Sequence, residues 1–165
     1  MAASRVVGID LGTTNTIVAW AEASGAAPLH VFPIPQLVTA GETEARPLFP
    51  SCLYVPLAGE ITGDPFLDAP YATGDFARRR GSEVPGRLVA SAKSWLCHSG
   101  VDRTAAILPW GADEASDLPR ISPIDASARY LAHVKRTWNT AFPDLPLEAQ
   151  HVILTVPASF DEVAR

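Results

Sequence analysis

The residues with the clearest chemical potential form the run GIDLGTTN at positions 8–15. A short apolar segment ends in an aspartate and is followed by a turn that contains a glycine and two hydroxyl residues. Such a turn presents backbone N–H groups and hydroxyls to one small concavity, which suits phosphate oxygens. Gly12 lets the backbone approach an anion closely because it has no Cβ. The pattern is typical of phosphate binding.

Asp10 adds a second kind of chemistry to this turn. Its carboxylate cannot bind a phosphate directly but can hold hydrated Mg²⁺, an ion that keeps several waters and takes one or two carboxylates. Asp10 followed by Thr13, Thr14 and Asn15 therefore indicates a site for a nucleoside triphosphate. The alternative is an ordinary hairpin turn rich in Gly and Thr, from which Asp10 accepts hydrogen bonds. Neither GxxxxGK[ST] nor GxGxxG occurs, which excludes a P-loop and a Rossmann dinucleotide site.

The segments around this turn favour β-structure. Apolar runs at 6–9 and 17–21 flank it, which predicts a β-hairpin. Residues 29–34 and 52–55 are further strand candidates. The polar, proline-bearing stretch 41–50 between them is expected to be a surface loop.

The middle of the chain is broken by Gly, Pro and Asp. Residues 62–115 contain only short helical windows, at 75–80 and 88–96. We interpret residues from about 41 to 118 as a loop-rich subdomain inserted into the main fold.

A helix start is signalled at Ser122 and Pro123. Ser122 can cap the helix, proline suits its first position, and Asp125 completes a capping box. Phe142-Pro143 is expected to end the helix. Its predicted apolar face, at steps of three and four, comprises Ile124, Ala128, Leu131, Val134, Trp138 and Phe142.

The last apolar run, 152–156, is β-branched and ends at a proline. Such a run predicts a strand buried on both faces, so the sheet should be covered by helices. Asp161 is expected to cap a further helix. The fold class predicted is α/β, with a mixed sheet that opens on the antiparallel hairpin and receives this strand after a helical crossover.

Composition narrows the function classes. The chain has 165 residues, 47% of them hydrophobic, which is enough for one core. The net charge of −5 and a single basic run, Arg78–Arg80, do not favour nucleic acid as a partner. Cys52 and Cys97 are too far apart in the sequence to suggest a metal site, and the four histidines show no metal-binding spacing. Without a signal-like or membrane-spanning segment, a cytoplasmic location is expected.

With these residues in place, the chain resembles a known family. Positions 8–15 are similar to the first phosphate loop of the actin, sugar-kinase and heat-shock-chaperone superfamily. Three later segments, FPSCLYV at 49–55, AKSWL at 92–96 and VILTVPASFDEVAR at 152–165, resemble the seventy-kilodalton heat-shock (DnaK-type) chaperones in order and approximate spacing. The resemblance implies a ribonuclease H-like, actin-like ATPase fold, with residues 1–165 as the first part of the ATPase domain (lobe I).

The resemblance also implies roles for individual residues. Thr13 and Thr14 would contact the β- and γ-phosphates of ATP or ADP and the attacking water, and Asp10 would hold the Mg²⁺ shell. Lys93 would point at the γ-phosphate and stabilise charge during hydrolysis. Without its flanking match, Lys93 would be interpreted as a solvated surface lysine.

Two late residues match positions that relay nucleotide state to a peptide-binding domain. These are Pro157 and Arg165, although Pro157 could also simply stop a strand and Arg165 could simply sit in a helical first turn. Asp161 and Ser94 depart from the residues usual in the family. These departures indicate a divergent member.

The resemblance implies a chaperone ATPase that gates peptide binding, with unfolded polypeptides and co-chaperones as partners of domains beyond this stretch. Only the phosphate wall of the nucleotide site is expected here, so nucleotide affinity should be weak. Two alternatives within the superfamily are a filament-forming bacterial actin relative, against which Phe160 argues, and a carbohydrate kinase.

Overall fold

The structure, a computed structural model, describes residues 4–68, 70–84, 86–98, 100–113 and 117–156. The expectations for Pro157, Phe160, Asp161 and Arg165 lie outside the described residues.

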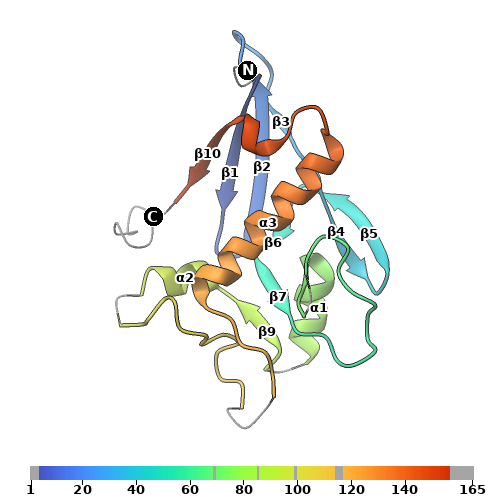
Figure 1. The fold of residues 1–165 in the computed structure, drawn as a ribbon, viewed down its shortest axis with the longest axis vertical. Coiled ribbons are helices and arrows are strands. Elements are labelled where there is room, and N and C mark those ends of the chain that lie inside the picture. The colour runs from blue at the N-terminus through green and yellow to red at the C-terminus, as the bar shows by residue number, and fades with distance from the viewer. Residues whose placement is uncertain (1–3, 69, 85, 99, 114–116, 157–165) are drawn as a thin grey trace.

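The largest sheet has five strands and is mixed. Its strand order is β10-β1-β2-β3, and β6 pairs with β2. The strands are β1 (Arg5–Leu11), β2 (Asn15–Glu22), β3 (His30–Val31), β6 (Phe49–Pro50) and β10 (His151–Thr155). Because β1 is antiparallel to β2 and parallel to β10, the predicted mixed sheet is confirmed (Figure 1).

The opening hairpin forms as its sequence pattern predicts. Alternate residues of β1, namely Val7, Ile9 and Leu11, are buried at 0–5% exposure, and Ile9 is in register with the buried Val18 of β2. Side chains two residues apart share one face of a strand, so this alternation fixes which face meets the core.

The predicted strand at 29–34 is divided in two. β3 ends at Val31, and β4 (Ile34–Thr39) begins a second sheet with β5 (Glu42–Arg46). Pro33 between them has no N–H to donate to a ladder, which marks the point where the chain leaves the first sheet.

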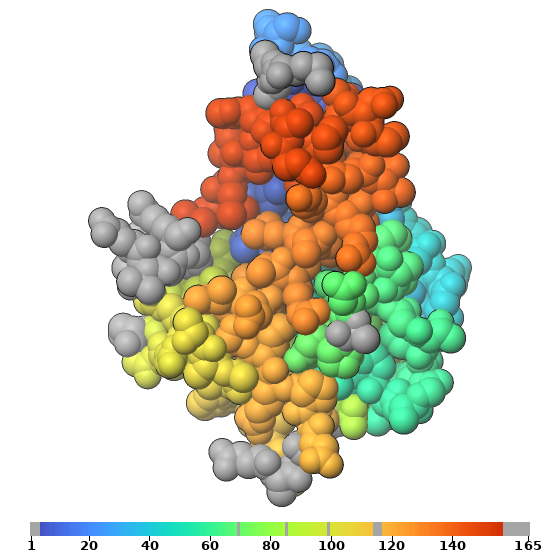
Figure 2. Space-filling model, in the orientation of Figure 1, coloured from blue at the N-terminus to red at the C-terminus, as the bar shows by residue number. Residues whose placement is uncertain are grey.

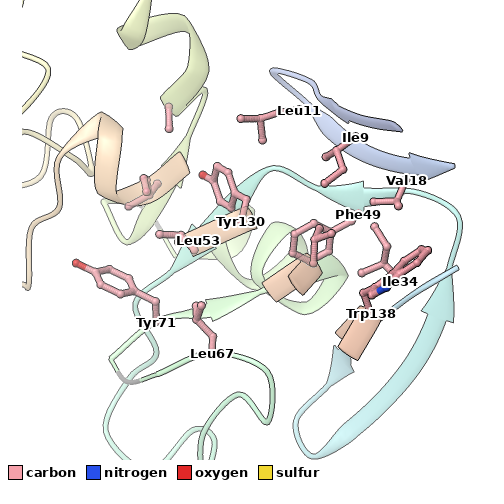
Figure 3. Packing of buried hydrophobic residues seen from close by; sticks show 14 of the residues in the cluster. Ile9, Leu11, Val18, Ile34, Phe49, Leu53, Leu67, Tyr71, Tyr130 and Trp138 are labelled. Carbon is pink, nitrogen blue, oxygen red and sulfur yellow. The ribbon is translucent and has the colours of Figure 1, made fainter. Parts of the chain in front are cut away.

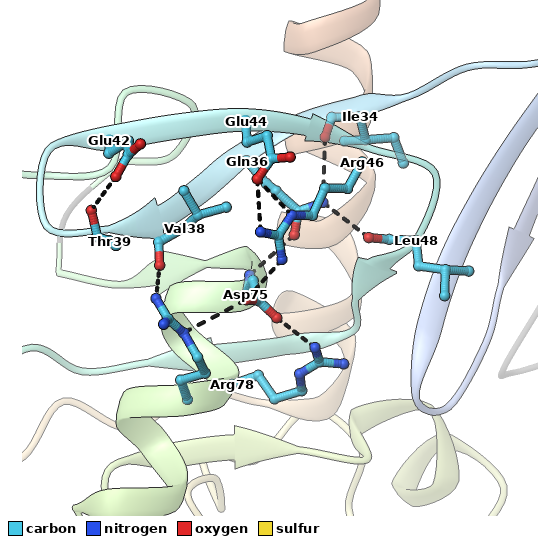
Figure 4. Close-up of polar contacts among 11 residues, drawn as sticks. Ile34, Gln36, Val38, Thr39, Glu42, Glu44, Arg46, Leu48, Asp75 and Arg78 are labelled. Carbon is cyan, nitrogen blue, oxygen red and sulfur yellow. Dashed lines mark hydrogen bonds and ion pairs between the residues drawn. The ribbon is translucent and has the colours of Figure 1, made fainter.

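The surface loop predicted at 41–50 is wrong, because most of it is strand. The residues of β5 are mostly polar and exposed. The segment therefore lacks the alternation of apolar and polar residues by which a half-buried strand is recognised in a sequence. The β4–β5 hairpin is instead held by tertiary contacts: Arg46 pairs with Asp75 at 2.9 Å, and Gln36 accepts a hydrogen bond from the Asp75 amide at 3.0 Å (Figure 4). The Gln36 side chain also donates to the Leu48 carbonyl.

A third sheet underlies the expected subdomain. Its order is β8-β7-β9, formed by β7 (Cys52–Tyr54), β8 (Ala72–Thr73) and β9 (Leu88–Ala90), with α1 (Gly74–Glu83) beside it. The strand at 52–55 and the helical window at 75–80 are thus confirmed. The window at 88–96 is half wrong, because β9 precedes α2 (Ala92–Leu96). The left-handed φ of 56° at Ser91 separates the two elements.

The long helix α3 (Pro123–Ala141) begins where its cap predicts. Ser122 Oγ accepts from the Asp125 amide at 3.0 Å, and Phe142 is the C-terminal cap. The 3₁₀ turn η1 (Leu147–Ala149) follows and leads into β10.

The predicted apolar face of α3 is only partly correct. Val134 and Trp138 are fully buried, whereas Ile124 is 38% exposed. The buried face includes the polar residues Ser127 and Thr137, whose hydroxyls donate to carbonyls within the helix. A polar side chain whose hydroxyl is hydrogen-bonded can be buried with little loss of free energy. A prediction based on apolar residues alone therefore misses these positions.

The main core lies between α3 and the inner faces of the sheets. Tyr130 and Trp138 of α3 meet Phe49 and Leu53 there, alongside Ile9 and Val18 of the hairpin (Figure 3). This core fixes the hairpin relative to the rest of the chain.

The expectation that residues 152–156 are buried on both faces is wrong for the described part of the chain. β10 is an edge strand, and Val152, Ile153 and Leu154 are 39–49% exposed. A strand of this composition is buried on both faces only where layers cover both sides. No such double cover exists within residues 4–156 as described. None of the described helices is long and apolar enough to cross a membrane.

Candidate functional site

The β1–β2 turn is closed by the amide of Gly12. This amide lies 3.0 Å from the Asn15 carbonyl oxygen and 3.1 Å from that of Asp10. A Cβ at position 12 would lie 2.2 Å from the Asn15 oxygen, which is closer than real Cβ atoms approach backbone. Position 12 therefore requires glycine for the turn itself. Its amide is occupied within the turn.

The donors that remain are those of Thr13 and Thr14. Both residues are exposed, and among the described residues neither amide donates to a protein backbone group. Two adjacent amides and two hydroxyls thus belong to the exposed turn of the hairpin. This arrangement matches the donor set that phosphate oxygens require.

Ser51 stabilises the turn through two hydrogen bonds. Its amide donates to the Thr14 carbonyl at 2.9 Å, and its hydroxyl lies 3.0 Å from that of Thr16. Ser51 and Thr16 are both buried, at 3% and 0% exposure. The segment 49–55 therefore supports the turn. The one indication of this in the sequence was that Ser51 belongs to the segment FPSCLYV, which resembles the chaperone family.

Asp10 is the penultimate residue of β1 and is exposed. Thr155 Oγ1, on the parallel neighbour β10, donates to Asp10 Oδ1 at 2.7 Å. The second carboxylate oxygen accepts no hydrogen bond from a described residue, and Asp10 is exposed. A single carboxylate oriented by one hydroxyl fits an ion that retains most of its water shell.

Asn15 brings an unusual feature to the turn. Its Oδ1 is buried and has no hydrogen-bond partner among the described residues. Unsatisfied buried polar atoms are rare in folded proteins and require an explanation. A ligand or ordered water at the turn would supply one.

Lys93 is not joined to the turn by any contact in the described part of the chain. It lies in the first turn of α2, is half-buried, and makes no ion pair with a described carboxylate. Figure 1 shows α2 beyond the ends of β1 and β10, on the side toward which these strands run. A contact of Lys93, on α2, with Asp10 or Thr13 stays a prediction.

The two cysteines differ in their surroundings. Cys52 is buried, and burial raises the pKa of its thiol to about 12. Cys97 is half-buried at the end of α2. Among the described residues, no group of three or more His, Cys, Asp or Glu side chains could hold a metal ion.

Comparison with known proteins bears on the whole chain. It is 31% identical to the chaperone protein HscA of Enterobacter sp. (strain 638), across 96% of this chain. The chain is similar to HscA chaperones over nearly its whole length. HscA homologues of Vibrio atlanticus (strain LGP32) and Bordetella pertussis (strain Tohama I) are 29% and 25% identical over the same share. No family model matches the chain.

The HscA similarity has a limited reach. The chain spans 23% of the length of each of these relatives. At the level of the family, the similarity agrees with the resemblance to the seventy-kilodalton heat-shock chaperones. It assigns no role to Asp10, Thr13 or Lys93.

Proposed function

We propose that the chain is the N-terminal part of the actin-like ATPase domain of a seventy-kilodalton heat-shock-like chaperone. The observation that carries this proposal is the HscA similarity, which extends over 96% of the chain and includes the β1–β2 turn. In this proposal residues 1–165 belong to lobe I, with an inserted subdomain at about 41–118, in a cytoplasmic protein.

The β1–β2 turn is the proposed phosphate site. Thr13 and Thr14 donate their amides and hydroxyls to the β- and γ-phosphates of ATP or ADP. Gly12 keeps the turn tight, and Asn15 Oδ1 accepts from an ordered water. Support comes from the amides of Thr13 and Thr14, which donate to no backbone group in the described part of the chain.

Asp10 and Lys93 are the proposed electrostatic residues. Asp10, oriented by Thr155, accepts hydrogen bonds from the water shell of Mg²⁺. Lys93 places a positive charge toward the γ-phosphate, where negative charge develops during transfer to water. ATP supplies the reactive phosphoanhydride when it is bound.

The partners in this proposal are unfolded polypeptides and co-chaperones. They would be bound by the portion of an HscA-like protein that this chain does not span. ATP-dependent release of a labelled unfolded peptide, measured on a complete gene product, tests that part of the proposal. Release that is independent of nucleotide would contradict it.

The phosphate site is tested on the chain itself by NMR with ¹⁵N labelling. Mg·ATP and Mg·tripolyphosphate should both shift the amide resonances of Thr13 and Thr14, whereas adenosine should not, because only phosphate contacts are available. Affinity should be weak, since most ATP contacts in an actin-like site come from elsewhere. Tight binding by calorimetry, or equal shifts with adenosine, contradicts the assignment.

Variants sharpen this test. Lys93→Gln should weaken the response to Mg·ATP while leaving the fold unchanged, because Lys93 makes no ion pair with described residues. Lys135→Gln is the matched control, since it removes one charge from a lysine that pairs with Glu148, away from the turn. An equal effect of both substitutions would remove Lys93 from the site.

A further inference from the structure

A hollow lies along the outer side of α3, apart from the β1–β2 turn. It has a volume of about 460 Å³ and is bounded by α3 and by residues from the segments 66–71 and 104–122. We call it the arginine groove, because Arg120, Arg129 and Arg136 all line it. Figure 2 shows the face on which α3 lies beside the segment around 66–71.

The guanidinium groups of the arginine groove are poorly neutralised. Arg120 donates to the Ala112 carbonyl at 3.0 Å, and Arg129 donates to the Asp68 carbonyl at 3.2 Å. Among the described residues neither has a carboxylate within ion-pair distance. Of the three arginines, Arg136 alone has a described carboxylate within this range, that of the exposed Asp68 at 3.4 Å. Such a surface pair contributes little.

The second acidic residue of the groove is committed elsewhere. Asp125 accepts from the Ser122 hydroxyl at 2.7 Å as part of the α3 cap. Three arginines against Asp68 and Asp125 give the described lining of the groove a net charge of +1, although the whole chain carries −5. Positive potential gathered in one hollow of an acidic protein is complementary to an anionic ligand.

The floor of the groove is partly apolar. Leu67, Tyr71 and Ile121 are buried beneath it, and the Arg129 guanidinium lies 4.9 Å from the centre of the Tyr71 ring. Stacking on an aromatic ring holds a guanidinium in a fixed orientation, ready for a planar carboxylate. The groove thus offers fixed cations beside aliphatic and aromatic surface.

We propose that the arginine groove binds an acidic segment of a partner protein, in which Asp or Glu side chains alternate with an aliphatic one. Carboxylates meet Arg120 and Arg129, and the aliphatic side chain covers the surface near Tyr71 and Ile121. Nucleic acid fits less well, because it requires an extended basic stripe. The three arginines are instead confined to one hollow.

The test is fluorescence anisotropy on the complete chain, with a short labelled peptide in which glutamate alternates with leucine. Arg129→Gln and Arg120→Gln should each weaken binding about tenfold, as expected when one partner of a charged contact is removed. Binding should also weaken as salt is raised. Lys135→Gln on the same helix removes an equal charge outside the groove and should leave the affinity unchanged.

Several outcomes would overturn the proposal. A glutamine-for-glutamate peptide that binds equally well would show that charge recognition is absent. Inorganic phosphate or a single-stranded oligonucleotide that competes as well as the peptide would indicate a general anion site. Equal losses for Arg129→Gln and Lys135→Gln would do the same. Circular dichroism of each variant verifies the fold, and if Arg129→Gln unfolds, Arg120→Gln decides the question.

Discussion

Thr155 Oγ1 and Asp10 Oδ1 lie 2.7 Å apart, although 145 residues separate them along the chain. The contact exists because β10 pairs in parallel with β1 and sets Thr155 beside Asp10 in register. The carboxylate of Asp10, which the sequence predicts to hold Mg²⁺, is thus oriented by a residue that is distant in the sequence.

Replacing Thr155 by Val should release the Asp10 carboxylate while keeping the shape of β10. Since the contact is exposed, the free energy of unfolding should fall by less than about 1 kcal/mol. The Mg²⁺ dependence of the Mg·ATP-induced NMR shifts should weaken more clearly, because an unrestrained carboxylate holds the water shell less well. Asp10→Asn should abolish that dependence. An unchanged Mg²⁺ response in both variants would refute the role of Asp10.

Gly12→Ala should destabilise the protein by roughly 1–3 kcal/mol, because its Cβ would lie 2.2 Å from the Asn15 carbonyl oxygen. Urea denaturation measures the loss. Gly8→Ala on the same strand is the control, since a Cβ there meets only the Ala19 oxygen at an ordinary 3.8 Å. Equal effects at both positions would show that the turn can relax.

Ser51→Ala should cost about 1–3 kcal/mol, because the buried Thr16 hydroxyl loses its partner. Amide hydrogen exchange should also increase around Thr14, whose carbonyl accepts from the Ser51 backbone. Ser4→Ala, at an exposed position, serves as the reference. A stability change at Ser51 no larger than at Ser4 would count against its supporting role.

His133 should make the fold sensitive to acid. Burial lowers the pKa of His133, and Nε2 donates to the Pro35 carbonyl at 2.8 Å while Nδ1 lies 2.9 Å from Thr73 Oγ1. Phe49 and Phe66 pack on the ring, and Asp64 and Arg136 are the charges nearby.

The unfolded chain therefore binds a proton at His133 at higher pH than the folded chain does. The stability contributed by the neutral ring is present above the unfolded pKa of about 6.5 and is lost as pH falls below it toward the folded pKa. Urea midpoints between about pH 7.5 and about pH 5 measure the slope. His133→Gln should flatten it, whereas His30→Gln, at an exposed site, should not.

Cys52 and Cys97 should differ in reactivity. The raised pKa of Cys52, about 12, leaves almost no thiolate near neutral pH, and its sulfur is buried. Iodoacetamide should therefore label Cys97 first and Cys52 only on unfolding, as read by peptide mass spectrometry. Labelling of both at one rate in the native protein would contradict the burial of Cys52.

The sequence by itself determined the elements whose causes are local. The hairpin follows from apolar alternation on either side of a glycine-bearing turn, and the start of α3 follows from the Ser122 cap and Pro123. Each interaction joins residues only a few positions apart, so the pattern contains all its partners. The candidate phosphate turn was visible for the same reason.

Only the tertiary structure decided the rest. The β4–β5 hairpin depends on Asp75, about thirty residues away, and the buried face of α3 accepts His133 because Pro35 and Thr73 satisfy it. β10 is exposed because no second layer covers it among the described residues. Polar residues and edge strands are stabilised by residues that are distant in the sequence. A local sequence pattern contains no information about those residues.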